Sequence, residues 1–472
     1  MSTGNPGSAG SADGVPGQDV IDAFLANVTD ADRPGRPGSG VSLAAVVDEL
    51  AGLGVKPGAA VVIAMPNGRP LLLLFFAVLL AGGVPVLVPP SASAARVAAI
   101  GRRFGADALI APMVNAERHG APAKHPVGDA EIVFFPWPER RHYAAGEVIL
   151  MTSGTSGIFS GCLHDTGSLL RNAAMHAHAV GQRDTDTVLL NLPLHYSYGL
   201  VAQALASLVT GSRLVVCGPP FTPSAYAGTL REHRVTLSSL TPALVARLAA
   251  GDASWSRPLR VLTVGGDHLR PRYVEALLAG HPELELYLTY GLTEAGPRVS
   301  TLAAHLEPPR RHASVGLPLP GVRTSLRPSA LGDGSRELLV ESGTVLRRRV
   351  PDDRPDPLVA PRTIATGDLF EIDDDGYHYY RGRLSDSVVV NDEKVWLPSV
   401  REIAASIPGV LRATTRVYQS DDERRYDLDV YVDHPDQAQA TEIERTLGRL
   451  LLRAERPARI TLRPISDAGW HK

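Results

Sequence analysis

The sequence predicts an α/β protein: a large N-terminal domain of two parallel-rich sheets flanked by helices, with a small β-rich subdomain, then a small mobile α+β C-terminal domain. Two observations predict this fold class. Through the first three quarters of the 472 residues, short apolar runs alternate with helical patterns, which is typical of parallel sheets with crossover helices. Beyond about residue 383 the runs become hairpin-like, and a compact set of helices and strands follows, which indicates a second domain.

The elements of the large domain are expected in a regular order, because apolar runs that are too short for helices alternate with longer periodic segments. Strands are predicted at residues 59–64, 84–88, 108–111, 188–192, 213–217, 259–264 and 284–288. Helices are predicted at residues 43–53, 71–81, 167–180, 202–210 and 242–250. Residues 310–350 carry shorter strand signals, 337–341 among them, separated by Pro and Gly, so the β-rich subdomain is expected there.

The C-terminal domain is expected to begin with a hairpin and to end with a strand. Its predicted elements are hairpin strands at 388–390 and 394–396, a helix at 399–406, strands at 413–418 and 426–432, a helix at 436–454 and a last strand at 459–463.

Three segments are expected along the chain. Residues 1–37 are predicted to be a disordered tail, because the first 19 residues are rich in Gly, Ser, Pro and Asp and lack the basic start and apolar stretch of a signal peptide. Residues 38–383 are expected to form the N-terminal core domain. Residues 384–472 are expected to form the C-terminal domain, with a hinge near Ser385.

Residues 71–88 carry no charge and are long enough to be a candidate for a membrane span. Gly82, Gly83 and Pro85 interrupt this stretch. Because these residues end helices, we interpret it as a buried helix that leads into a core strand, and no membrane association is expected.

The composition excludes several classes of protein. The chain has 47 Lys+Arg against 50 Asp+Glu, a formal net charge of −3, which gives no electrostatic footprint for nucleic acid. Its two cysteines, Cys162 and Cys217, cannot form a disulfide framework and suit a cytoplasmic protein. The sequence contains neither a CxxC nor an HExxH pattern, the usual signs of a zinc site. Only four of the basic residues are lysines, the rest being arginines, which suits a high-GC bacterium and, by association, secondary metabolism.

A run of hydroxyl and glycine residues directly follows the apolar residues 147–151. It consists of Thr152, Ser153, Gly154, Thr155, Ser156 and Gly157. Glycines allow the backbone to turn its N–H groups toward an anion, and hydroxyls add further donors. The run therefore predicts a phosphate-binding loop, and it differs from a Walker A loop because no Gly-Lys-Ser/Thr follows.

Further motifs follow in order. They are Leu192 to Leu200 (LPLHYSYGL), Gly265-Gly266, Tyr290-Gly291-Leu292-Thr293-Glu294, Ser314 to Pro318 (SVGLP), Thr366-Gly367-Asp368 and Gly382 to Asp386 (GRLSD). Together with the loop, and over about residues 40–472, they resemble the adenylate-forming superfamily of acyl- and aryl-CoA synthetases, luciferases and nonribosomal adenylation domains. The resemblance implies the two-domain fold, with residues 38–383 as the adenylation core and residues 384–472 as a lid. It also implies an ATP-dependent, AMP-forming ligase.

The resemblance implies ATP and Mg²⁺ as cofactors and assigns a role to each motif. The loop from Thr152 to Gly157 would hold the phosphates, and Glu294 would be the Mg²⁺ ligand. The nucleotide would also be contacted by Gly265, Gly266, Tyr290 at the adenine, Gly291, Thr293 at the α-phosphate, Asp368 at both ribose hydroxyls, and Arg383. Thr152, Glu294 and the final residue, Lys472, are the expected catalytic residues.

The acid substrate is expected to lie against residues of two motifs, namely His195, Tyr196, Tyr198, Gly199 and Leu292. The segment 192–200 holds no carboxylate to pair with an ammonium group, which disfavours a simple α-amino acid. The resemblance therefore favours a small aryl or acyl acid. The activated acid would pass to a carrier-protein thiol, an amine or coenzyme A.

The chain departs from the family pattern at three places. Ser160 stands where relatives usually have a loop lysine, and Trp470 stands where they have a C-terminal lysine, with Lys472 two positions further on. Asn391-Asp392 replaces the glycine pair that admits a pantetheine thiol. These departures keep two alternatives open. One is a nitrite-activating, ATP-dependent diazotase of an aryl amine, and the other is a non-catalytic nucleotide- or acid-binding partner protein.

Overall fold

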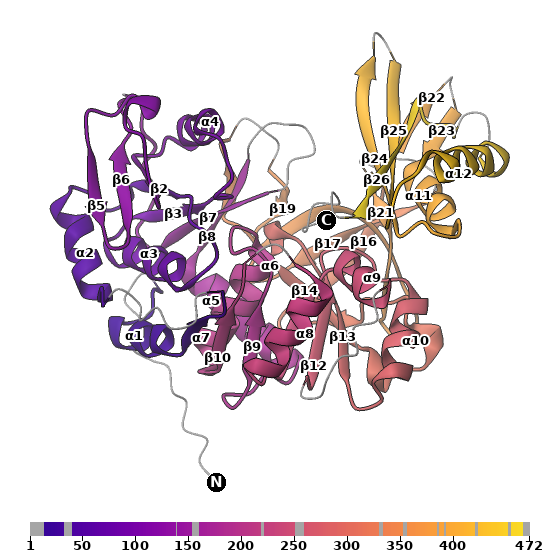
Figure 1. Ribbon diagram of the computed structural model, residues 1–472, viewed down its shortest axis with the longest axis horizontal. Coiled ribbons are helices and arrows are strands. Elements are labelled where there is room, and N and C mark those ends of the chain that lie inside the picture. Colours follow the sequence, from indigo (N-terminus) through magenta and orange to yellow (C-terminus); the bar gives the residue numbers. More distant parts are fainter. Residues whose placement is uncertain are drawn as a thin grey trace.

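The structure is a computed structural model. It describes residues 14–32, 40–137, 139–152, 160–218, 221–250, 259–329, 334–352, 356–384, 387–390, 393–420, 423–451 and 455–465. Two eight-stranded sheets with helices around them form most of the molecule, and the small C-terminal domain lies beside α9 and α10 at one end (Figure 1). The predicted α/β fold class is confirmed.

The first sheet has the strand order β1-β10-β9-β11-β12-β13-β14-β15, and its first six strands run parallel. The strands are β1 (Val28–Asp30), β9 (Thr187–Leu190), β10 (Arg213–Val216), β11 (Leu237–Leu240), β12 (Val261–Gly265), β13 (Glu285–Gly291), β14 (Arg298–Ala303) and β15 (Leu317–Pro318). The helical elements around it are α5 (Thr166–Ala179), α6 (Ser197–Gly199), the π-helical η2 (Leu200–Leu205), α7 (Ala206–Thr210), α8 (Pro223–Glu232), α9 (Pro242–Ala250) and α10 (Pro271–Gly280).

The second sheet has the order β18-β8-β7-β3-β2-β4-β6-β5, with parallel pairing only among its four central strands β7, β3, β2 and β4. The strands are β2 (Ala60–Ile63), β3 (Val84–Leu87), β4 (Ala108–Ala111), β5 (Lys124–Val127), β6 (Ala130–Phe134), β7 (Glu147–Met151), β8 (Gly161–Asp165) and β18 (Arg348–Val350). Its helices are α2 (Leu43–Gly52), α3 (Arg69–Leu80) and α4 (Ala94–Phe104). Ser93 caps the start of α4 and Gly105, with φ of 59°, ends it.

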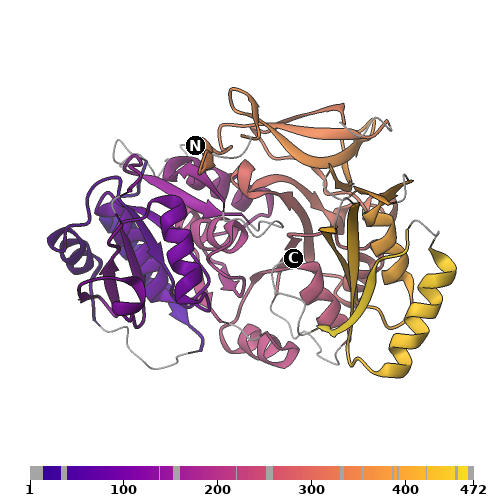
Figure 2. The same cartoon turned by 90° about the horizontal axis from the view of Figure 1, so that it is seen from above.

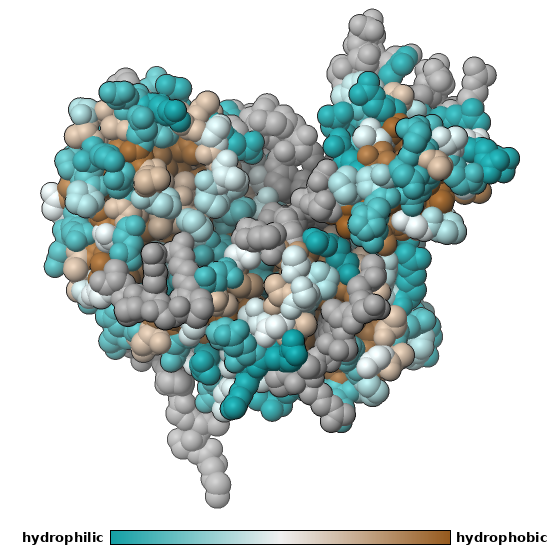
Figure 3. Space-filling model, in the orientation of Figure 1, coloured by the Kyte–Doolittle hydropathy of each residue, from teal (hydrophilic) through white to brown (hydrophobic). Residues whose placement is uncertain are grey.

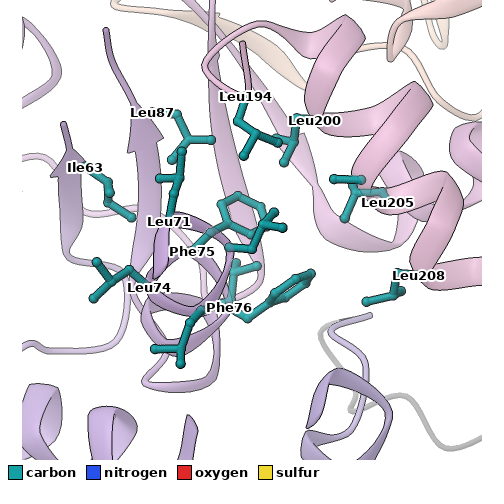
Figure 4. Packing of buried hydrophobic residues seen from close by; sticks show 14 of the residues in the cluster. Ile63, Leu71, Leu74, Phe75, Phe76, Leu87, Leu194, Leu200, Leu205 and Leu208 are labelled. Atoms are coloured by element: carbon teal, nitrogen blue, oxygen red, sulfur yellow. The ribbon is translucent and has the colours of Figure 1, made fainter. Parts of the chain in front are cut away.

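Helix α3 lies in the core that the two sheets share. All of its residues from Leu71 to Leu79 are buried, and Phe75 points toward Leu194 and Leu200 of the segment that covers the first sheet (Figure 4). This packing explains the uncharged stretch that the sequence predicts to be a buried helix. Within the described ranges, no helix combines the length and the apolar character that a bilayer crossing needs.

The prediction of a disordered tail over residues 1–37 is wrong for its second half. Residues 18–26 form helix α1 (Gln18–Ala26), and β1 adds an edge strand to the first sheet. The helix is amphipathic, with Ile21, Phe24 and Leu25 buried, and the Phe24 ring packs edge-on against Phe76 of α3, 6.0 Å between centroids. The apolar face of this helix is short and directly follows a polar, Gly-rich tail. Residues 1–13 and 33–39 lie outside the described part of the chain.

The β-rich subdomain is larger than predicted, because it continues to Arg383. Its antiparallel strands are β16 (Arg323–Pro328), β17 (Arg336–Glu341), β19 (Leu358–Ala360), β20 (Thr363–Ile372) and β21 (His378–Arg383). Figure 2 shows these orange strands between the violet N-terminal part and the yellow C-terminal domain.

The C-terminal domain contains the predicted elements in the predicted order. They are β22 (Ser387–Val390), β23 (Glu393–Trp396), α11 (Leu397–Ser406), β24 (Arg412–Ser420), β25 (Glu423–Val432), α12 (Gln437–Leu450) and β26 (Arg459–Pro464). Arg270 of the large domain donates a hydrogen bond to the carbonyl of Ala405 at 2.8 Å, so the two domains touch. On the face seen in Figure 3, this domain carries many hydrophilic residues with hydrophobic ones among them. The expected hinge residue Ser385 lies outside the described residues.

Candidate active site

Several predicted site residues lie at the carboxyl edge of the first sheet. Strand β12 ends at Gly265 and strand β13 ends at Gly291, and the 3-10 turn η3 (Thr293–Ala295) follows. Ligands of open parallel sheets bind at this edge, because the loops that leave the strands there are free to form a crevice. The geometry around Tyr290, Thr293 and Glu294 therefore decides what the site can bind.

Asp368 of β20 is held between two residues that the sequence also assigns to the nucleotide. The Tyr290 hydroxyl donates to its Oδ2 at 2.7 Å, and Arg383 Nε donates to its Oδ1 at 2.6 Å. Burial raises the pKa of Asp368, while the charge of Arg383 opposes that rise, and Asp368 in turn raises the pKa of Arg383. A carboxylate has about four acceptor sites, so lone pairs remain for further donors such as the hydroxyls of a diol.

Glu294, in the turn η3, already has a cationic neighbour. Arg349 Nη2 of β18 donates to its Oε1 at 3.0 Å, and both side chains are largely buried. Among the described residues there is no cluster of three or more metal-ligating side chains. Magnesium is commonly held by one or two carboxylates together with substrate phosphates, so a single glutamate fits this ion. Arg349 was not among the predicted residues, although three successive arginines at 347–349 are a visible signal.

Thr293 is fixed by two side chains from other elements. The ring Nε2 of His164 hydrogen-bonds to the Thr293 carbonyl at 2.9 Å, and the hydroxyl groups of Ser197 and Thr293 lie 3.1 Å apart. Burial lowers the pKa of His164 to about 4, so the ring is neutral at pH 7 and donates to the carbonyl from Nε2. These contacts hold the segment of Ser197 and the motif of Thr293 side by side on one side of the candidate site.

The ends of the expected phosphate-binding loop meet at Thr152 and Ser160. The Thr152 amide donates to the Ser160 carbonyl at 3.1 Å, and the two hydroxyl oxygens lie 2.8 Å apart. Ser160 is buried. The other predicted loop residues, Ser153 to Gly157, lie outside the described part of the chain, as do Asn391, Asp392, Trp470 and the expected catalytic Lys472.

The residues expected to contact the acid are only partly brought together. His195 and Tyr196 form one pair, with ring centroids 4.4 Å apart, and burial lowers the pKa of His195 to about 4. Tyr198 lies at the sheet edge, where its hydroxyl is 3.0 Å from Thr263 Oγ1. Leu292 stands apart, because its side chain is buried in the hydrophobic cluster that also contains Val340 and Phe370.

Three of the predicted glycines are required by close packing. A Cβ on Gly199 would lie 2.6 Å from the Pro193 carbonyl oxygen, and one on Gly265 would lie 2.3 Å from Thr289 Oγ1. A Cβ on Gly291 would lie 2.1 Å from a backbone oxygen. Gly266 has φ of +89°, a conformation that favours glycine.

One residue of the site carried no signal in the sequence. Arg298, the first residue of β14, is 3% exposed and lies over the ring of Tyr198. It was not predicted, because a single arginine after Gly296-Pro297 cannot be distinguished in the sequence from an exposed loop residue.

The chain is similar to a family of known proteins. A family model described as "AMP-binding enzyme" matches residues 43–333. A 4-coumarate–CoA ligase-like protein of Oryza sativa subsp. japonica is 26% identical over 431 residues, 80% of this chain and 71% of that protein. A 2-succinylbenzoate–CoA ligase of Lactococcus lactis is 26% identical over 264 residues, and the match spans 56% of this chain and 55% of that protein.

Among solved structures, an o-succinylbenzoate–CoA synthetase of Bacillus subtilis in complex with its acyl-adenylate has the same fold. It superposes with a TM-score of 0.74 at 19% identity, over 94% of each chain.

Proposed function

The chain belongs to the AMP-binding enzyme family and is an AMP-forming ligase, and on that premise we propose that it activates a small aryl or acyl acid as its acyl-AMP. The acyl group then passes to a nucleophile, which is a carrier-protein thiol, an amine or coenzyme A. The observation that carries the proposal is Asp368, buried between Tyr290 and Arg383 and linked through Tyr290 to the motif of Thr293 and Glu294. The two curated relatives are named for small carboxylic acids, 4-coumarate and 2-succinylbenzoate.

The residues of the chain divide the work of the adenylation step. The Asp368 carboxylate accepts hydrogen bonds from the ribose hydroxyls, and Tyr290 lies against the adenine. Thr152 and the loop that follows it hold the phosphates. The Thr293 hydroxyl donates a hydrogen bond to an oxygen of the α-phosphate. A carboxylate oxygen of the acid attacks the α-phosphorus, the bond to the pyrophosphate oxygen breaks, and acyl-AMP and pyrophosphate are the products. Attack of the nucleophile on the acyl carbon then releases AMP.

Glu294 is the residue that would hold Mg²⁺, which neutralises charge on the phosphate oxygens when it is bound. Its Oε1 is engaged by Arg349, so the ion would use the other oxygen or compete with the guanidinium. The arginine also places positive charge near the expected phosphates, where the chain lacks the usual loop lysine at Ser160.

The composition supports a cellular compartment and a type of organism for this activity. Its two cysteines suit the cytoplasm, and its many arginines and few lysines suit a high-GC bacterium, where such enzymes often serve secondary metabolism.

Pyrophosphate release measured with ATP, Mg²⁺ and a panel of aryl acids, acyl acids and nitrite tests the proposal. We expect release with at least one carboxylic acid, and much slower release from the Asp368→Ala variant at the same ATP concentration. Release with nitrite alone would instead identify a diazotase. No release with any compound by a folded protein would leave the non-catalytic partner as the function.

A further inference from the structure

Arg298 is held in place by its backbone. Asn172 of α5, which is fully buried, accepts from the Arg298 amide through Oδ1 at 2.9 Å and donates to the Arg298 carbonyl through Nδ2 at 2.9 Å. In the ladder between β13 and β14, Arg298 lies opposite Gly291. The position of this residue is therefore set independently of its side chain, at the edge where the site lies.

The guanidinium lies between two residues that the sequence assigns to ligand binding. Its Cζ is 4.5 Å from the centroid of the Tyr198 ring, which is the geometry of a cation–π contact. Beside it is Gly265, where an added Cβ would lie 3.1 Å from Arg298 Nη2. Any larger residue at position 265 would press on the guanidinium, so the glycine makes its placement possible.

The charge of Arg298 has no counter-charge in the described part of the chain. Its Nε and Nη2 are buried without a hydrogen-bond partner, and no carboxylate there forms an ion pair with it. The nearby His176 stays neutral, because burial and the charge of Arg298 both lower its pKa. Arginine does not lose its proton in proteins, and a buried charge without a partner is costly. An anion from outside the chain would remove this cost.

The two unpartnered nitrogens indicate which anion fits. The N–H groups of Nε and Nη2 leave the same edge of the planar guanidinium, and this fork matches the two oxygens of a carboxylate. We propose that Arg298 binds a second carboxylate of the acid, so that the substrate is a small dicarboxylic acid. One carboxylate is adenylated beside Thr293 and the other is held by Arg298. This inference rests on the proposed function and specifies its substrate class.

Matched pairs of acids test it. Pyrophosphate release is measured with terephthalate against 4-methylbenzoate and with succinate against butyrate, where only the second carboxylate differs. A site built around a charged donor rejects the analogue that lacks the partner, so we expect kcat/KM to be about 100-fold higher for the dicarboxylic acid of the preferred pair. Arg298→Met should reverse the preference toward the methyl-ended acid, and Arg298→Lys should keep part of it.

The control is Arg272→Met, which removes an exposed arginine that lies over Tyr273 with Cζ 4.9 Å from the ring centroid, and it should leave the preference unchanged. Equal use of both acids of every pair by the wild-type protein overturns the inference while the proposed function survives. If no acid is turned over, the proposed function fails. The inference on Arg298 is then tested by the melting temperatures of the wild-type protein and of Arg298→Met, measured with and without each acid. Stabilisation by the dicarboxylic acids that is absent in Arg298→Met supports the inference, and its absence in the wild-type protein refutes it.

Discussion

Arg260 and Arg298 lie at opposite edges of the same sheet and have opposite surroundings. Arg260 precedes β12 at the amino edge, where it donates to Asp186 at 2.7 Å, to Glu285 at 3.1 Å and to the Gly181 carbonyl at 3.0 Å. Arg298, at the carboxyl edge, is more deeply buried and makes no ion pair with the described residues.

The difference indicates that the two edges of the sheet serve different purposes: one stabilises the fold and the other binds the ligand. Parallel strands place all their amino ends together and all their carboxyl ends together. At the amino edge the charges compensate one another within the chain, which stabilises the fold. At the carboxyl edge, Arg298 has no counter-charge among the described residues, which is the state expected of a site that a ligand completes.

The largest expected effect concerns the amino edge. Arg260→Met should lower the free energy of unfolding by about 3 kcal/mol, because it leaves the buried carboxylate of Asp186 without its ion pair. Urea unfolding measures this loss, and acid selectivity at 20 °C should stay unchanged. A shift in selectivity, or a loss no larger than that of the exposed Arg272→Met, would contradict the division between the edges.

Replacing the carboxylate of the predicted ribose site should have the next largest effect. Asp368→Ala removes the acceptor for the ribose hydroxyls and should weaken ATP binding about 100-fold, as expected for lost hydrogen bonds to a charged group. Calorimetric titration with ATP measures this change. The isosteric Asp368→Asn variant separates charge from shape, and unchanged affinity in both variants would rule out the ribose role.

A smaller effect is expected at Glu294, a carboxyl-edge residue whose charge is paired with Arg349. Arg349→Gln frees Glu294 from its ion pair and should lower the Mg²⁺ concentration for half-maximal nucleotide binding about tenfold, which corresponds to about 1.4 kcal/mol. Fluorescent nucleotide binding over a Mg²⁺ series measures it. Arg348→Gln on the same strand, whose partner is Asp352, is the matched control. Identical metal dependence in both variants would show that Arg349 does not compete for Glu294.

The smallest effect concerns the neutral histidine behind Thr293. The pKa of His164 is about 4 in the folded protein against 6.5 as the ordinary value. The unfolded chain therefore binds more protons between pH 6.5 and 4, and stability falls as pH falls through this range. His164→Asn should reduce the loss between pH 7.5 and 5.5 by about 1 kcal/mol. Urea titrations at both pH values measure it. The exposed His434→Asn should not change it, and parallel pH profiles for wild type and His164→Asn would disprove the argument.

Local patterns predicted much of the fold but not all of it. The apolar run at 71–81 predicted α3, since only a buried helix can carry so many apolar residues, and Gly82 marked its end. Helix α1 was missed, because nine residues with three buried positions give a weak periodic signal beside a Gly-rich tail. The strand signal at 337–341 predicted β17, but the extent of its sheet depends on pairing with β20, which no local pattern encodes.

The alternation of strands and helices and the order of the motifs could be read from the sequence, because each is encoded by residues close together in the chain. The motifs also predicted Asp368, Thr293 and Glu294 as site residues. The partners of these side chains depend on the folded structure. Glu294 meets Arg349 across 55 positions, and Arg298 is fixed by Asn172 across 126. Whether a buried charge is compensated depends on side chains that folding brings together from distant segments, and local spacing does not contain that information.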